Sequence, residues 1–118
     1  MMHMNALMDM HNERCDPDVG RTAPLTRKEV LSLVPKVTGW EIRESKLRRL
    51  YRGENFEDCV IFLDDLTDLC NTQCHYPDIS ISKGRLIEVS WYTYASGGLT
   101  RNDFIMASKM NSSEKFNI

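Results

Sequence analysis

The chain has 118 residues, of which 42% are hydrophobic and 27% charged, and its formal net charge at neutral pH is -2. This length suits one domain and leaves no material for a second core, since domains commonly run ~100–150 residues. A weakly negative chain has no overall attraction for nucleic acid or anionic lipid, so we expect neither as a partner.

The first residues have no cationic segment in front of an apolar run, which is unlike a secretory signal. No stretch approaches the ~20 apolar residues of a membrane-spanning helix. Four cysteines in such a chain are expected to remain reduced thiols. We therefore predict a cytoplasmic protein with no membrane partner.

Residues 1–22 lack hydrophobic periodicity and are predicted to form a flexible N-terminal arm. Thr26 followed three residues later by Glu29 has the spacing of a capping box, which predicts the start of a helix. Pro35 and Gly39 end this short helix. Its apolar residues have helical spacing: Val30, Leu31 and Val34.

Residues 40–52 are predicted to form two strands around a turn at Ser45 and Lys46. Cations dominate this part of the chain, and three of them are candidates for contact with an acidic partner: Arg48, Arg49 and Arg52. The alternative is an ordinary solvated strand face.

The longest helix is predicted over residues 56–74, with Asn55 as its N-terminal cap. Its apolar residues recur at three- and four-residue steps: Phe56, Cys59, Val60, Leu63, Leu66, Leu69 and Cys70. Residues 53–78 carry several carboxylates and no Lys or Arg. This separation of basic and acidic segments favours self-association or a charged protein partner.

Two further strands are predicted over residues 78–82 and 86–94, joined by a turn at Lys83 and Gly84. Thr100 and Asp103 form a second capping box that begins the last helix, which runs to about Met110. Residues 23–112 are thus the folded domain and residues 113–118 a C-terminal tail. Strands joined by short turns favour an α+β fold, in which helices pack on one face of a four-stranded antiparallel sheet.

The sequences CHYPDI at residues 74–79 and YASGGLT at residues 94–100, followed by Asp103, resemble the signature of the pterin-4a-carbinolamine dehydratases. The resemblance covers roughly residues 25–110. It implies the family's four-stranded antiparallel sheet with helices on one side, assembled into dimers or tetramers.

The resemblance places the family's site on five positions: Asn71 for its Glu, His75, Tyr76 and Tyr94 for its three histidines, and Asp103 for its Asp. The family's reaction expels a hydroxyl from C4a of the pterin and removes a proton from N5. Imidazoles suit both proton transfers because their pKa lies near 6.5. Tyrosines are mostly protonated at neutral pH and are weak bases. These vestigial pterin-pocket positions imply little turnover, so none is assigned as catalytic.

Each position also has an ordinary structural interpretation. His75 could cap the last carbonyls of the preceding helix, Tyr76 and Tyr94 could be aromatic wall residues, and Asp103 could serve only as a helix cap. Cys70, Cys74 and His75 have a spacing compatible with zinc, but no fourth ligand is visible. We expect no metal and no cofactor.

One branch of this family has incomplete catalytic histidines and assists RuBisCO assembly in bacteria with α-carboxysomes, and the chain resembles that branch. The resemblance implies a RuBisCO assembly factor, a chaperone-like protein that binds RuBisCO subunits as a homodimer or tetramer in the bacterial cytoplasm or with carboxysomes. The alternative is an active or impaired 4a-hydroxytetrahydrobiopterin dehydratase. A dimerising transcriptional coactivator is a third hypothesis, although nothing resembles a DNA-reading element.

Overall fold

The computed structural model describes residues 9–118, and its centre is a four-stranded antiparallel sheet with the order β1-β2-β4-β3. The strands are β1 (Glu41–Arg43), β2 (Lys46–Arg52), β3 (Asp78–Ser82) and β4 (Leu86–Trp91). A two-residue turn at Glu44 and Ser45 closes the β1–β2 hairpin, and a three-residue turn over residues 83–85 closes the β3–β4 hairpin. Four of these turn residues have positive φ: Glu44, Ser45, Lys83 and Gly84. Such turns match the twist of antiparallel strands.

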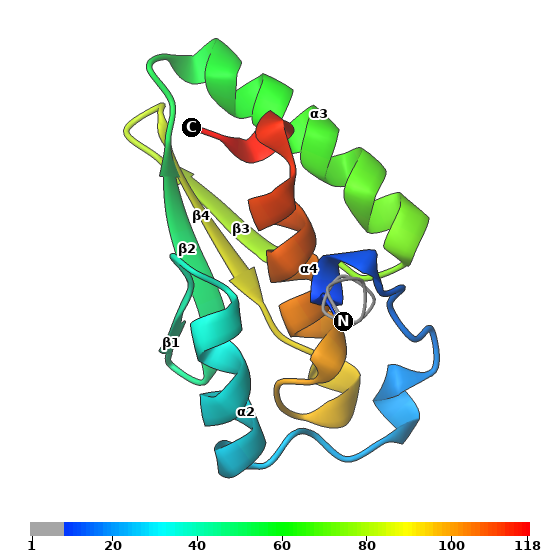
Figure 1. Cartoon of the computed structure of the whole chain (residues 1–118). Coiled ribbons are helices and arrows are strands. Elements are labelled where there is room, and N and C mark those ends of the chain that lie inside the picture. The colour runs from blue at the N-terminus through cyan, green and yellow to red at the C-terminus, as the bar shows by residue number, and fades with distance from the viewer. Residues whose placement is uncertain (1–8) are drawn as a thin grey trace, which may run out of the picture.

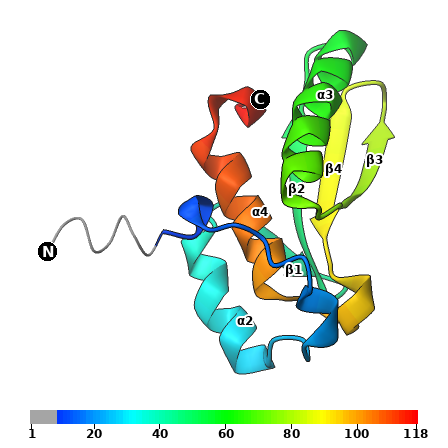
Figure 2. The same cartoon turned by 90° about the vertical axis from the view of Figure 1, so that its right-hand side faces the viewer.

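Three α-helices within residues 9–118 lie on one face of this sheet (Figures 1 and 2). They are α2 (Arg27–Leu33), α3 (Phe56–Gln73) and α4 (Arg101–Ser112). The predicted α+β architecture is therefore confirmed. The first capping box is present as well, because Thr26 Oγ1 accepts a hydrogen bond from Glu29 N at 3.2 Å and Glu29 Oε1 accepts one from Thr26 N at 2.8 Å.

The core lies between the inner face of the sheet and helices α3 and α4. Strands β2 and β4 contribute Leu47, Tyr51, Ile87, Val89 and Trp91, and α3 contributes Cys59, Phe62, Leu66 and Cys70. Helix α4 buries nearly every residue from Asn102 to Ala107. The periodicity of α3 therefore identified its core face, whereas α4 is buried on more sides than an amphipathic pattern requires.

Two predicted boundaries differ from the structure. Lys46 is the first residue of β2 rather than part of the turn, because it pairs with Arg43 across the hairpin. Strand β4 ends at Trp91 instead of residue 94, since Tyr94–Ser96 form a 3₁₀ turn and Thr93 makes only an isolated bridge with Gly98. The chain must turn here to enter α4.

Both ends of the described chain differ from the predicted arm and tail. Residues 9–22 pack against α4 and bury Met10 and Cys15. Phe116 is also buried, and its ring lies 5.3 Å from that of Phe62. The irregular spacing of these apolar residues hid their role. Residues 1–8 of the predicted arm lie outside the described residues.

Across residues 9–118, no helix combines the length and the apolar character that crossing a membrane requires.

Candidate functional site

Four of the five predicted pocket positions lie at the end of α3 or the start of α4: Asn71, His75, Tyr76 and Asp103. Asn71 lies in the last turn of α3, and Asp103 lies in the first turn of α4. Cys74 ends α3 in the left-handed conformation with a φ of 55°, and His75 and Tyr76 follow it. The left-handed residue turns the chain sharply, which brings the imidazole of His75 toward α4.

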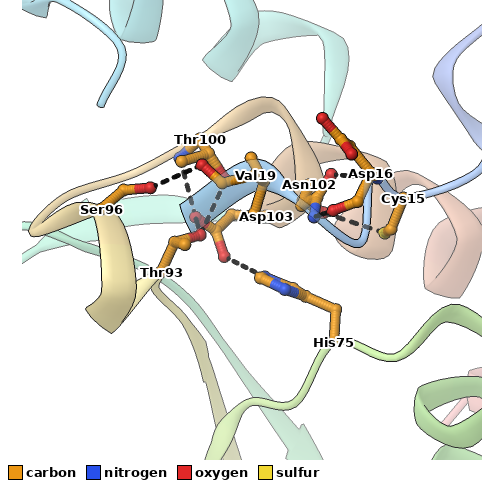
Figure 3. Close-up of polar contacts among 9 residues, drawn as sticks. All are labelled: Cys15, Asp16, Val19, His75, Thr93, Ser96, Thr100, Asn102 and Asp103. Atoms are coloured by element: carbon orange, nitrogen blue, oxygen red, sulfur yellow. Dashed lines mark hydrogen bonds and ion pairs between the residues drawn. The ribbon is translucent and has the colours of Figure 1, made fainter. Parts of the chain in front are cut away.

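A buried pair forms the centre of the site, because His75 Nε2 lies 2.8 Å from Asp103 Oδ1 (Figure 3). The other carboxylate oxygen of Asp103 accepts hydrogen bonds from Thr93 Oγ1 at 2.8 Å and Thr100 N at 2.9 Å. Three groups thus converge on a carboxyl group with no solvent exposure. This arrangement fits an ionised carboxylate, which only accepts hydrogen bonds. Nε2 of His75 then carries a proton and Nδ1 is the nitrogen left to exchange one.

The ring of His75 stacks on Trp91, with centroids 5.8 Å apart and an interplanar angle of 13°. Trp91 therefore packs against one face of the imidazole, and Asp103 holds its edge through Nε2. The predicted helix-capping role of His75 falls to its backbone, whose N–H donates to Cys70 O at 3.3 Å. Asp103 does cap α4 through Thr100 N, but it also holds the imidazole.

Asn71 and Tyr76 form a separate, exposed pair. The Tyr76 hydroxyl donates to Asn71 Oδ1 at 3.1 Å, and the Tyr76 side chain is 59% exposed. Two neutral groups thus lie where the family resemblance places a carboxylate and an imidazole. They can orient a polar ligand but supply neither a charge nor a base at neutral pH.

Tyr94 belongs to a third group, together with Lys46 and Asp78. Its hydroxyl donates a short hydrogen bond to Asp78 and accepts one from Lys46 Nζ at 2.9 Å. Lys46 also pairs with Asp78 Oδ2 at 3.1 Å. The Tyr94 hydrogen bond and the Lys46 ammonium together hold the pKa of Asp78 below its usual value. The Tyr94 hydroxyl therefore donates one hydrogen bond and accepts another.

Replacing Tyr94 with Phe is expected to raise the pKa of Asp78 toward its ordinary value, because the hydroxyl is the largest cause of the depression. A carboxyl group whose pKa is lower in the folded than in the unfolded state stabilises the fold at pH values above the unfolded-state pKa. This contribution is lost as the pH falls through the folded-state pKa. The stability difference between wild type and Y94F should accordingly disappear in acid. An NMR titration of the Asp78 carboxyl carbon measures the shift.

Tyr76→Phe is the matched control, since it removes an exposed hydroxyl that does not touch Asp78. An Asp78 carboxyl that titrates alike in Y94F and wild type would show that the short hydrogen bond does not form in solution.

No group of three His, Cys, Asp or Glu within the described part of the chain is placed to hold a metal ion. Cys70 is buried, and burial raises the pKa of its thiol to about 12, whereas Cys74 is exposed. The imidazole of His75 is bonded through Nε2 to Asp103.

The three candidate partner-binding arginines have different surroundings. Arg48 forms an ion pair with Glu88 on β4. Arg49 lies over the ring of Tyr51 at 4.9 Å and donates to Asn111 Oδ1 at 2.8 Å, so it fastens β2 to α4. Only Arg52 is exposed without a described partner. The surface available to an acidic partner is smaller than the sequence suggested.

Sequence reasoning missed Thr93, Trp91 and Lys46 as parts of the site. Thr93 and Trp91 share one face of the strand predicted over residues 86–94, because side chains alternate along a strand. In the structure both are buried. Lys46 and Asp78 stand on β2 and β3, which are separated by β4. No local spacing could have brought these two residues together.

Comparison with known proteins identifies the same family that the sequence motifs resemble. The family model for pterin 4 alpha carbinolamine dehydratase matches residues 23–113. A Methylococcus capsulatus protein named "Putative pterin-4-alpha-carbinolamine dehydratase" is 38% identical over 101 residues, which cover 84% of this chain and 88% of that protein. A Rubrobacter xylanophilus protein of the same name is 33% identical over 89% of this chain and 98% of its own length.

Among solved structures, a transcriptional coactivator/pterin dehydratase from Brucella melitensis superimposes with a TM-score of 0.68. It is 23% identical, and the match covers 75% of this chain and 96% of that one. At this identity the likeness is one of fold. Residues 9–22 lie outside the range of the family match.

Proposed function

The chain belongs to the pterin 4 alpha carbinolamine dehydratase family, and on that premise we propose that it is a RuBisCO assembly factor that keeps the family's scaffold without its dehydratase turnover. It would act as a small homo-oligomer in a bacterial cytoplasm, where carboxysome-associated RuBisCO subunits are its clients. Fold alone does not decide between enzyme and binding protein, so the argument depends on the site.

The hydroxyls of Tyr76 and Tyr94 are already hydrogen-bonded to neighbouring side chains, and this supports the proposal most strongly. The dehydration needs one group to protonate the departing hydroxyl and another to accept the N5 proton. Tyr94 is held between Lys46 and Asp78, and Tyr76 is bonded to Asn71. His75, the remaining imidazole, is buried and bonded to Asp103. Because His75 is the one imidazole among these positions, the site is better suited to binding than to turnover.

The choice of RuBisCO as client depends on the sequences CHYPDI and YASGGLT, which resemble the assembly-factor branch. Co-expression with RuBisCO large and small subunits should raise the amount of assembled holoenzyme on a native gel. Arg52→Glu is an informative variant because Arg52 is an exposed candidate without a described partner. Glu57→Lys, an exposed charge change on α3, is its matched control. Holoenzyme yield that is the same with and without the protein would contradict the proposal.

The second candidate function is a slow dehydratase, and the His75–Asp103 pair is the observation that favours it. A buried carboxylate that fixes one tautomer of an imidazole is a common way to prepare a general base. With one base left, we expect turnover of a pterin carbinolamine ~10²–10⁴-fold below that of a family member with all its histidines. A rate within about tenfold of such a member would instead favour the enzyme.

A further inference from the structure

Residues 9–22, here called the strap, cross the outside of α4 and reach the turn at residues 94–96. The strap is fastened at its start by the buried side chain of Met10 and farther along by Cys15. At its end, Gly20 lies so close to the turn that a Cβ there would stand 2.7 Å from the Cβ of Ala95. The strap therefore fits closely against the segments that carry the site.

Two successive strap residues bridge the ends of α3 and α4. Cys15 N donates to Gln73 Oε1 at 2.9 Å, and Gln73 is the last residue of α3. Asp16 N donates to Asn102 Oδ1 at 2.9 Å, and Asn102 Nδ2 donates back to Asp16 O at 2.9 Å. In the chain, Gln73 lies two residues before His75, and Asn102 directly precedes Asp103. The strap thus joins the same two helix ends that the His75–Asp103 pair joins.

A third contact reaches the loop that carries Tyr94. Ser96 Oγ donates to Val19 O at 2.9 Å, as Figure 3 shows together with the contacts of Cys15 and Asp16 to Asn102. Each of the three segments that hold His75, Tyr94 and Asp103 is therefore bonded to the strap.

The buried amide side chains of Gln73 and Asn102 have their described hydrogen-bond partners in the strap. Asn102 is 2% exposed and Gln73 is 9% exposed, and the hydrogen bonds described for both side chains go to strap backbone. A buried polar group without a partner is strongly unfavourable. Helices α3 and α4 thus present polar groups that the strap satisfies.

We propose that the strap is a positioning element for the site, and that Gln73 and Asn102 are the positioning residues through which it sets the distance between His75 and Asp103. His75 follows the end of α3, and its backbone is tied to that helix by the hydrogen bond from its N–H to Cys70 O. The strap adds a second restraint on this helix end through Gln73. This inference holds whether the site binds a ligand or turns one over.

The test follows the proton between His75 Nε2 and Asp103 by NMR in the full chain carrying Gln73→Ala and Asn102→Ala. Its exchange with water should accelerate about tenfold or more, because two buried anchors of the helix ends are lost. Core amides of β2 and β4 should keep their wild-type exchange rates. Thr72→Ala is the control, since it removes an exposed hydroxyl next to Gln73 whose described hydrogen bond stays within α3, to Asp68 O.

If strap amides exchange faster in the double variant while the His75 proton is unaffected, the strap only stabilises the fold and the proposal is overturned. Met10→Ala loosens the strap from its other side and leaves Gln73 and Asn102 intact. Should the double variant not fold, exchange at the His75 proton and at the Cys15 and Asp16 amides in M10A decides the question. Parallel acceleration supports the proposal, and an unchanged His75 proton contradicts it.

Discussion

Combining Asn71→Glu, Tyr76→His and Tyr94→His is expected to raise dehydration of a pterin carbinolamine by ~10²–10⁴-fold over the wild-type rate. The three changes restore the residues that the family resemblance places at these positions. Asn71 and Tyr76 are already in contact at 3.1 Å, so a carboxylate and an imidazole would meet there without movement of the backbone. An imidazole at position 94 would lack the short bond to Asp78 and be free to exchange a proton. Stopped-flow measurement of carbinolamine decay gives the rate.

His75→Ala in the restored background is the control for this gain. It removes the buried imidazole and should return turnover to near the wild-type level if all three imidazoles act together. Variants with all three substitutions that fold but stay as slow as wild type would show that these positions do not limit the rate. In that case the shape of the pocket, rather than its acid/base groups, would be the obstacle.

Asp103→Ala is expected to lower the free energy of unfolding by ~3–5 kcal/mol. The carboxylate is fully buried, and its removal leaves three groups without their acceptor: His75 Nε2, Thr93 Oγ1 and Thr100 N. It also removes the reciprocal cap of α4, the helix that buries most of its residues. Urea denaturation followed by circular dichroism measures the loss.

Asp68→Ala on the exposed face of α3 provides the comparison, with an expected change within ~0.5 kcal/mol. Asp103→Asn should fall between the two, because an amide keeps one acceptor oxygen but presents a donor where the carboxylate had accepted. A loss below ~1 kcal/mol for D103A would mean that water replaces the carboxylate and that the site is open to solvent.

The fold was predictable because its signals are local. The Thr26–Glu29 box, the turn at Lys83 and Gly84, and the apolar periodicity of α3 each determine a nearby backbone conformation. The end of α3, the start of β2 and the end of β4 were predicted only to within one to three residues, since tertiary pairing helps to set them.

The site was predictable only where a motif names its residues. His75 and Asp103 come from such a motif, but their contact depends on how α3 meets α4. The strap had no signal at all, because its bonds use backbone groups of Cys15 and Asp16. Gln73 and Asn102 look like ordinary polar helix residues in the sequence, and only their burial reveals their partners.

Asp103 both caps α4 and holds His75, and the positions of the family's signature accordingly fall into a buried and an exposed group. The matching residues, His75 and Asp103, are buried and support one another, so changing either one would threaten the fold. The departures, Asn71, Tyr76 and Tyr94, lie on the surface, where substitution costs little stability. Substitution at the three exposed positions is therefore compatible with the fold, whereas His75 and Asp103 are constrained by their buried contact. Of the five positions, the three exposed ones are those that can vary with function at little cost in stability.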